Sequence, residues 1–151
     1  MTTRAAKGTE EALPRLWTKP FTILCVTVLL GYAHQSLLTP SIPLFIDHKG
    51  GSALLAGLTL LTFSIPSFAI RPWLGHLSDV WSAAGVLTLG LVLLALGGIG
   101  YLVPFLAVFL VASAIRGVGW AGLNTGGYTL LAAAAPATRR GEASGYYTAI
   151  T

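Results

Sequence analysis

The chain has 151 residues, of which 54% are hydrophobic and 9% are charged, and its formal net charge is +4. An ordinary soluble domain carries about 25% charged residues, so this composition excludes a soluble protein with a solvated surface. The Lys and Arg residues lie mostly in short segments between long apolar runs, which indicates membrane topology rather than nucleic-acid binding. The single cysteine, Cys25, excludes a disulfide framework.

The apolar runs predict an all-α integral membrane protein that spans the lipid bilayer several times. Residues 1–20 are polar and are expected to form a cytoplasmic tail. At about 1.5 Å per residue, each complete run is long enough to cross a hydrocarbon core of about 30 Å. A cleaved signal peptide is disfavoured for the first run, because its polar lead is long and no small-residue cleavage site follows. The predicted helices cover residues 21–45, 53–74, 83–103 and 105–131, and a further helix starts at about residue 143 and reaches residue 151.

The positive-inside rule predicts the orientation of these helices. Most cations lie before the first helix, near the end of the second, or between the fourth and fifth, so the amino terminus, the loop after the second helix and the loop after the fourth are expected in the cytoplasm. Lys49 alone lies on the other side. We therefore expect a multi-pass protein of the plasma (inner) membrane with a cytoplasmic amino terminus. The cytoplasmic cations are Arg4, Lys7, Arg15, Lys19, Arg71, Arg139 and Arg140.

Four polar residues of the first run recur at helical spacing and therefore share one face. His34 lies next to this face, where it could carry a proton or form a neutral hydrogen bond. Two prolines, Pro40 and Pro43, predict a kinked or loosened outer half of the helix. The four residues of the polar face are Tyr32, Gln35, Ser36 and Thr39.

The fourth run contains Arg116, Trp120 and Asn124 four residues apart, and Tyr128 continues the row. Arg116 lies about twelve residues into the run, too deep for its guanidinium to reach either surface easily. A lipid-facing arginine at this depth costs at least about 2.5–3.5 kcal/mol, so we expect it inside the bundle. The four apolar runs contain no Asp or Glu. Its charge therefore requires a water-filled cavity, an anionic substrate group or a carboxylate on a helix beyond Thr151.

Two stretches resemble signatures of the major facilitator superfamily. The segment RPWLGHLSDVW is similar to the family's loop between helices 2 and 3, in which an aspartate follows a glycine by four residues, as Asp79 follows Gly75. The segment from Arg116 to Tyr147 resembles the family's fourth helix, an arginine before a glycine-rich run, and its P-x-x-R-R-G-E link into the fifth. The matching residues of this second stretch are Arg116, Gly117, Gly119, Pro136, Arg139, Arg140, Gly141 and Glu142.

The resemblance implies a partial major-facilitator-type helix bundle, namely the first three-helix repeat plus the start of the second. It further implies a secondary active transporter, not an enzyme, that moves a small-molecule substrate by alternating access. The chain would be an amino-terminal fragment, inactive without its carboxyl-terminal helices. No soluble cofactor is implied, and proton-coupled efflux is a compatible subtype. The implied substrate cavity contains Tyr32, His34, Gln35, Arg116, Trp120 and Asn124, and the implied cytoplasmic gate contains Arg71, Gly75, Asp79, Arg139 and Arg140.

The chain departs from the family pattern after Asp79, where VWSAAG supplies no cation. Asp79 is therefore expected to pair with Arg139 or Arg140. A different class of function also fits the sequence. In that alternative, the chain is a complete four-helix membrane protein that oligomerises, without transporting, through the glycine-rich segments LGGIGY and RGVGWAG.

Overall fold

The computed structural model describes residues 15–103 and 105–151, and the elements in these ranges are all helices. Residues 1–14, which include Arg4 and Lys7 of the predicted tail, and Pro104 lie outside the described residues. The all-α fold class predicted from the sequence is confirmed. The elements are α1 (Lys19–His48), α2 (Ala53–Ala69), α3 (Arg71–Val80), α4 (Ala83–Gly100), α5 (Leu106–Ala134), the 3-10 helix η1 (Ala137–Arg139) and α6 (Arg140–Ala149).

Three of the described helices, α1, α4 and α5, are long and apolar enough to cross a membrane by themselves. The pair α2 and α3 provides a fourth span if the two are taken together, although they are bent by 42° at their junction. Serine side chains start two of these helices: Ser52 accepts a hydrogen bond from the amide of Leu55, and Ser82 accepts one from Gly85. Such N-caps satisfy amide groups that have no partner within the helix.

The segment RPWLGHLSDVW is helical, which corrects the prediction that it forms a loop. Helix α3 includes both Gly75 and Asp79, and only Trp81 and Ser82 separate α3 from α4. Pro72 explains the bend before α3, because proline has no amide hydrogen and its ring crowds the carbonyl group four residues earlier. The helical structure that begins in the second apolar run thus continues, after this bend, to Val80.

Helix α1 continues through Pro40 and Pro43 to His48, so neither proline ends it. The hydroxyl groups of Thr39 and Ser41 each donate to the backbone carbonyl four residues earlier. Bonds of this kind, from a hydroxyl to the carbonyl one turn earlier, occur where Ser and Thr lie within a helix.

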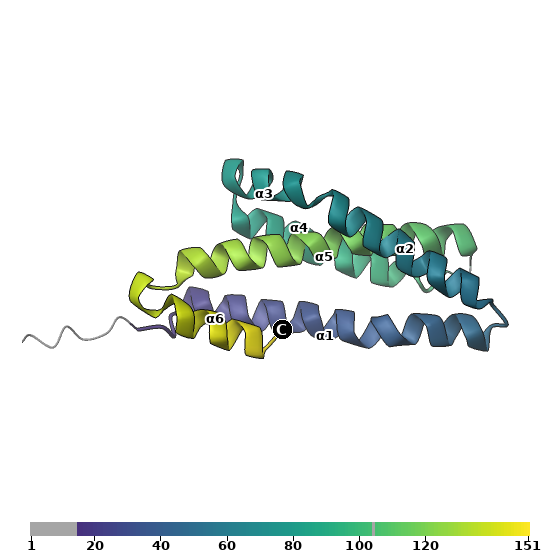
Figure 1. Cartoon of the computed structure of the whole chain (residues 1–151), viewed down its shortest axis with the longest axis horizontal. Helices are drawn as coiled ribbons and strands as arrows, with labels where there is room; N and C mark the ends of the chain where they lie inside the picture. Colours follow the sequence, from purple (N-terminus) through teal and green to yellow (C-terminus); the bar gives the residue numbers. More distant parts are fainter. Residues whose placement is uncertain (1–14, 104) are drawn as a thin grey trace, which may run out of the picture.

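Helix α5 is the central helix of the bundle and contacts each of the other α helices. Figure 1 shows α5 between the α2–α3 pair on one side and α1 with α6 on the other. In the most apolar 18-residue stretch of α5, 50% of the residues are buried, compared with 28% in the corresponding stretches of α1 and α4. Residues on α5 therefore face several neighbouring helices.

Glycines bring α4 and α5 into backbone contact. A Cβ added at Gly90 would lie 2.5 Å from the amide nitrogen of Leu123, and one at Gly119 would lie 2.7 Å from that of Leu94. A side chain has no room at either of these two positions, so the two backbones approach as closely as small-residue packing allows. We refer to α4 and α5 below as the α4–α5 pair.

Contacts between helices of this one chain also involve the glycines of LGGIGY and RGVGWAG, which the oligomerisation hypothesis assigns to contacts between copies. Gly97 packs against Arg116, Gly98 faces the ring of His34, and Gly117 packs on the backbone carbonyl of Phe63 in α2. These contacts lie within one chain. The glycine-rich segments are therefore not free faces available to a second copy.

The last described helix starts earlier than predicted, at Arg140 instead of about residue 143. Helix α5 ends before Pro136 because the residue that precedes a proline is disfavoured in the helical conformation, and Ala135 is extended. Glu142 in the first turn of α6 pairs with Arg139. Tyr147 anchors α6, since its side chain is fully buried and its ring lies tilted against that of Tyr128, with ring centroids 5.0 Å apart.

Candidate functional site

Arg116 lies at the centre of the candidate site. It projects from α5, is only 2% exposed, and has a backbone neighbour, Gly117, that lets α2 approach closely. Its guanidinium donates to Oε1 of Gln35 in α1 at 2.5 Å and to the hydroxyl of Tyr101 at 3.0 Å. The structure thus brings together two residues that the sequence analysis assigned to the cavity, Gln35 and Arg116.

Two aromatic rings complete the surroundings of this charge. The guanidinium carbon lies 5.6 Å from the ring centre of Phe63 in α2 and 5.2 Å from that of Tyr101. The negative face of an aromatic ring attracts a cation, more strongly where water is excluded. The side chains of Gln35, Tyr101 and Phe63 are uncharged, so they solvate the charge of Arg116 without cancelling it.

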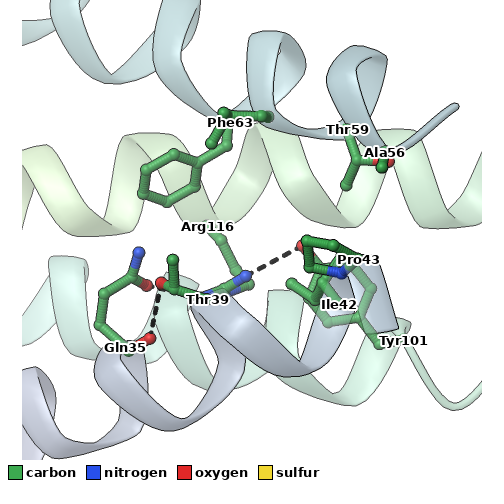
Figure 2. Close-up of a pocket in the computed structure, with 10 residues that line it drawn as sticks. Gln35, Thr39, Ile42, Pro43, Ala56, Thr59, Phe63, Tyr101 and Arg116 are labelled. Carbon is green, nitrogen blue, oxygen red and sulfur yellow. Dashed lines mark hydrogen bonds between the residues drawn. The ribbon is translucent and has the colours of Figure 1, made fainter. Parts of the chain in front are cut away.

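A small pocket of about 50 Å³ lies beside the guanidinium, between α1 and α2 (Figure 2). This volume has room for a few water molecules, whereas sites for drug-sized ligands measure about 300–1,000 Å³. No carboxylate is among its lining residues in the described part of the chain. These residues are Gln35, Thr39, Ile42, Pro43, Ala56, Thr59, Leu60, Phe63, Tyr101 and Arg116.

A second polar contact joins α1 and α5 along the same face. The hydroxyl of Tyr32 donates to Oδ1 of Asn124 at 2.7 Å, and Nδ2 of Asn124 donates to the backbone carbonyl of Trp120. The rings of Tyr32 and Trp120 meet edge to face with centroids 4.6 Å apart. Four of the predicted cavity residues therefore lie on the α1–α5 interface in two interhelical pairs, and Trp120 packs beside one of them.

The structure places His34 away from this set. Its ring packs against Gly98 of α4 and lines a groove between α1 and α4, on a different side of α1 from the pocket beside Arg116. Neighbouring positions on a helix point in different directions, about 100° apart at 3.6 residues per turn, so Gln35 and His34 cannot face the same partner.

Sequence reasoning did not identify Tyr101, Ser113 or Phe63. Tyr101 ends α4, and its hydroxyl lies 2.8 Å from that of Ser113, so it connects Arg116 to a second polar group on α5. Ser113 precedes Arg116 by three residues, and this helical spacing could have identified it. Tyr101 and Phe63 belong to other helices and have no such signal in the sequence.

The predicted gate residues do not form one cluster. Arg71 is exposed and its guanidinium lies over the ring of Phe68, and Gly75 has open space around it. Asp79 is exposed and forms no ion pair within the described residues, so its expected pairing with Arg139 or Arg140 is not observed. Arg139 instead makes a two-point ion pair with Glu142, with both contacts at 2.7 Å.

We expect the Tyr32–Asn124 hydrogen bond to couple α1 to α5 in energy as well as in geometry. In a double-mutant cycle with Tyr32→Phe and Asn124→Ala, the coupling free energy should be about 0.6 kcal/mol and at most about 1.7 kcal/mol, the range found for interhelical hydrogen bonds in membranes. The free energy of unfolding in detergent measures it. Tyr32→Phe combined with Thr88→Ala, whose hydroxyl donates only to its own helix, serves as the additive control. If the changes in free energy of unfolding add up for both pairs of substitutions, the Tyr32–Asn124 hydrogen bond contributes nothing to stability.

Comparison with known proteins gives one match. The model of the Major Facilitator Superfamily matches residues 3–151, nearly the whole chain. Neither the curated proteins nor the solved structures contain a match. The family resemblance inferred from the motifs is thereby confirmed.

Proposed function

Because this chain belongs to the major facilitator superfamily, a family of transporters, we propose that it is part of a secondary transporter that moves a small solute by alternating access. The two interhelical pairs between α1 and α5 are the observation that carries the proposal. They place Gln35 and Arg116, and Tyr32 and Asn124, on one polar face inside an otherwise apolar bundle. Polar groups at this depth are costly, and they mark solute or ion pathways in membrane proteins.

The two kinds of helix contact suggest which parts move. The α4–α5 pair is joined by close packing of backbone on backbone at glycines. Water or a solute cannot replace this kind of contact as it can replace a hydrogen bond. Helix α1 is held to α5 in this region by side-chain hydrogen bonds, which water or a polar solute can replace at little cost. We propose that α1 moves against a rigid α4–α5 pair, and that opening this contact enlarges the small pocket beside Arg116 into a solute cavity.

The finer features of this function are also proposals. The protein would lie in the plasma (inner) membrane with a cytoplasmic amino terminus, would represent the amino-terminal part of the transporter, and would export its solute with proton coupling. In Figure 1, the start of α1, the α3–α4 turn and the α5–α6 connection lie at one end of the bundle. Arg15, Lys19, Arg139 and Arg140 belong to these segments, as the positive-inside rule requires of a cytoplasmic end.

A reconstituted uptake assay tests the proposed transport. The protein, together with any sequence encoded beyond Thr151, is placed in liposomes with an imposed pH gradient, and accumulated metabolites are identified by mass spectrometry. We expect at least one solute to accumulate in a gradient-dependent manner, and we expect residues 1–151 alone to accumulate none above empty liposomes. Equal solute content in protein-containing and empty liposomes would contradict transport.

Cysteine labelling tests the proposed orientation. In a Cys25→Ser background, His48→Cys at the end of α1 should react with an impermeant thiol reagent added to intact cells, and Thr138→Cys in η1 should react only after lysis. Both native residues are exposed, so access to the reagent depends on the side of the membrane. His48 is preferred to Ser52 because Ser52 caps α2. The reverse labelling pattern would place the amino terminus outside.

A further inference from the structure

The guanidinium of Arg116 is buried and has no carboxylate partner among the residues that the structure describes. Arginine stays protonated in proteins, so the site holds a full positive charge at 2% exposure. The only ion pair within the described residues, between Arg139 and Glu142, lies elsewhere, and the pocket lining includes no carboxylate. A buried ion carries a desolvation cost of several kcal/mol, which neutral dipoles offset only in part.

The hydrogen bonding of this guanidinium is also incomplete. Gln35 and Tyr101 accept one hydrogen bond each, whereas arginine has five N–H donors. Its Nε atom is buried and has no partner among the described residues. The site therefore combines an uncompensated charge with a free donor, and both favour an anion.

The size of the pocket limits which anion fits. About 50 Å³ accommodates an ion about as large as a water molecule, or the end of a carboxylate, but excludes a phosphate ester or a drug-sized molecule. The apolar side chains of Ile42, Pro43, Ala56 and Leu60 line the remaining walls of the pocket. A charge interaction is stronger in such surroundings than at the surface.

We propose that the pocket between α1, α2 and α5 binds one compact monovalent anion against Arg116, either inorganic chloride or the carboxylate group of a small organic solute. The anion neutralises Arg116 and occupies the space that α1 and α2 enclose. This binding step is independent of transport, so a direct binding measurement tests it even if no transported solute is found.

Thermal unfolding of the purified protein at constant ionic strength measures this binding. Chloride, formate or acetate replaces gluconate, because the hydroxylated chain next to the gluconate carboxylate is too large and too polar for the apolar walls of the pocket. A ligand that binds only the folded state raises the melting temperature in a saturable manner. At about ten times the dissociation constant, we expect an increase of about 3–6 °C. A larger shift with chloride than with formate and acetate assigns the site to the inorganic ion, and the opposite order assigns it to a carboxylate.

Two substitutions locate the effect. Arg116→Leu should remove the anion-dependent shift, whereas Arg15→Leu, which removes the same charge from an exposed position, should retain it. Gln35→Glu provides a second variant that does not depend on deleting the buried arginine. It places a carboxylate at the oxygen that already accepts from Arg116, so it should abolish the anion-dependent shift and raise the melting temperature in gluconate.

The proposal fails if the wild-type protein melts at the same temperature in all four anions. It fails equally if Arg116→Leu or Gln35→Glu retains the saturable shift of the wild type, because the anion would then bind elsewhere.

Discussion

Replacement of Arg116 by leucine is expected to abolish transport while the protein still inserts and folds. The substitution removes the hydrogen bonds to Gln35 and Tyr101 and the charge between the rings of Phe63 and Tyr101. Hydrogen bonds to a charged group contribute about 1.5–3 kcal/mol each, and a loss of about 3 kcal/mol on the transport barrier lowers the rate by more than about a hundredfold. Stability should fall little, because leucine also removes the cost of burying a charge.

Arg116→Lys should give a partial effect. Lysine keeps the charge but lacks the planar fork that reaches two acceptors in two directions, so we expect transport to fall about tenfold. The assay is the initial rate of uptake, in liposomes, of a solute that the metabolite screen identifies. Size-exclusion chromatography verifies folding of each variant, and Arg15→Leu is the exposed control. A wild-type rate for Arg116→Leu would show that the arginine is a tolerated charge without a role in transport.

Gly90→Ala is expected to produce a large loss of stability, because the added methyl group would enter the backbone contact between α4 and α5. The new Cβ would lie 2.5 Å from the amide nitrogen of Leu123, 2.7 Å from the carbonyl carbon of Gly122 and 2.8 Å from the carbonyl oxygen of Gly119. These are backbone atoms, so they cannot move aside unless α4 and α5 separate. Overpacking of this kind costs about 1–3 kcal/mol in free energy of unfolding.

Gly57→Ala is the matched control, since it makes the same change in α2, where nothing lies within 4 Å of the added atom. This variant should be neutral or slightly stabilising, because alanine favours the helical conformation over glycine. The melting temperatures of the two variants in detergent measure the difference. Equal melting temperatures would show that the α4–α5 contact is looser than the structure describes.

Hydropathy in the sequence was sufficient for the all-α membrane class and for approximate helix positions, because the thickness of the bilayer sets the length of an apolar span. Hydropathy did not predict that helical structure continues beyond the second apolar run, where α3 contains Gly75 and Asp79. The apolar run ends near residue 74, whereas helix formation depends on backbone hydrogen bonds and continues into polar sequence. The motifs also led to the correct family, because they occur in the order and spacing that the family uses.

Helical spacing in the sequence predicted that Tyr32 and Gln35 share a face, and that Arg116 and Asn124 share another, since periodicity is a property of one helix. Only the tertiary structure decided that these two faces meet, that Tyr101 and Phe63 join them, and that His34 packs against Gly98 of α4. Contacts between helices depend on how close their backbones come. Here that approach is set by Gly90 and Gly119 between α4 and α5 and by Gly117 beneath α2, and the sequence shows these glycines without their partners.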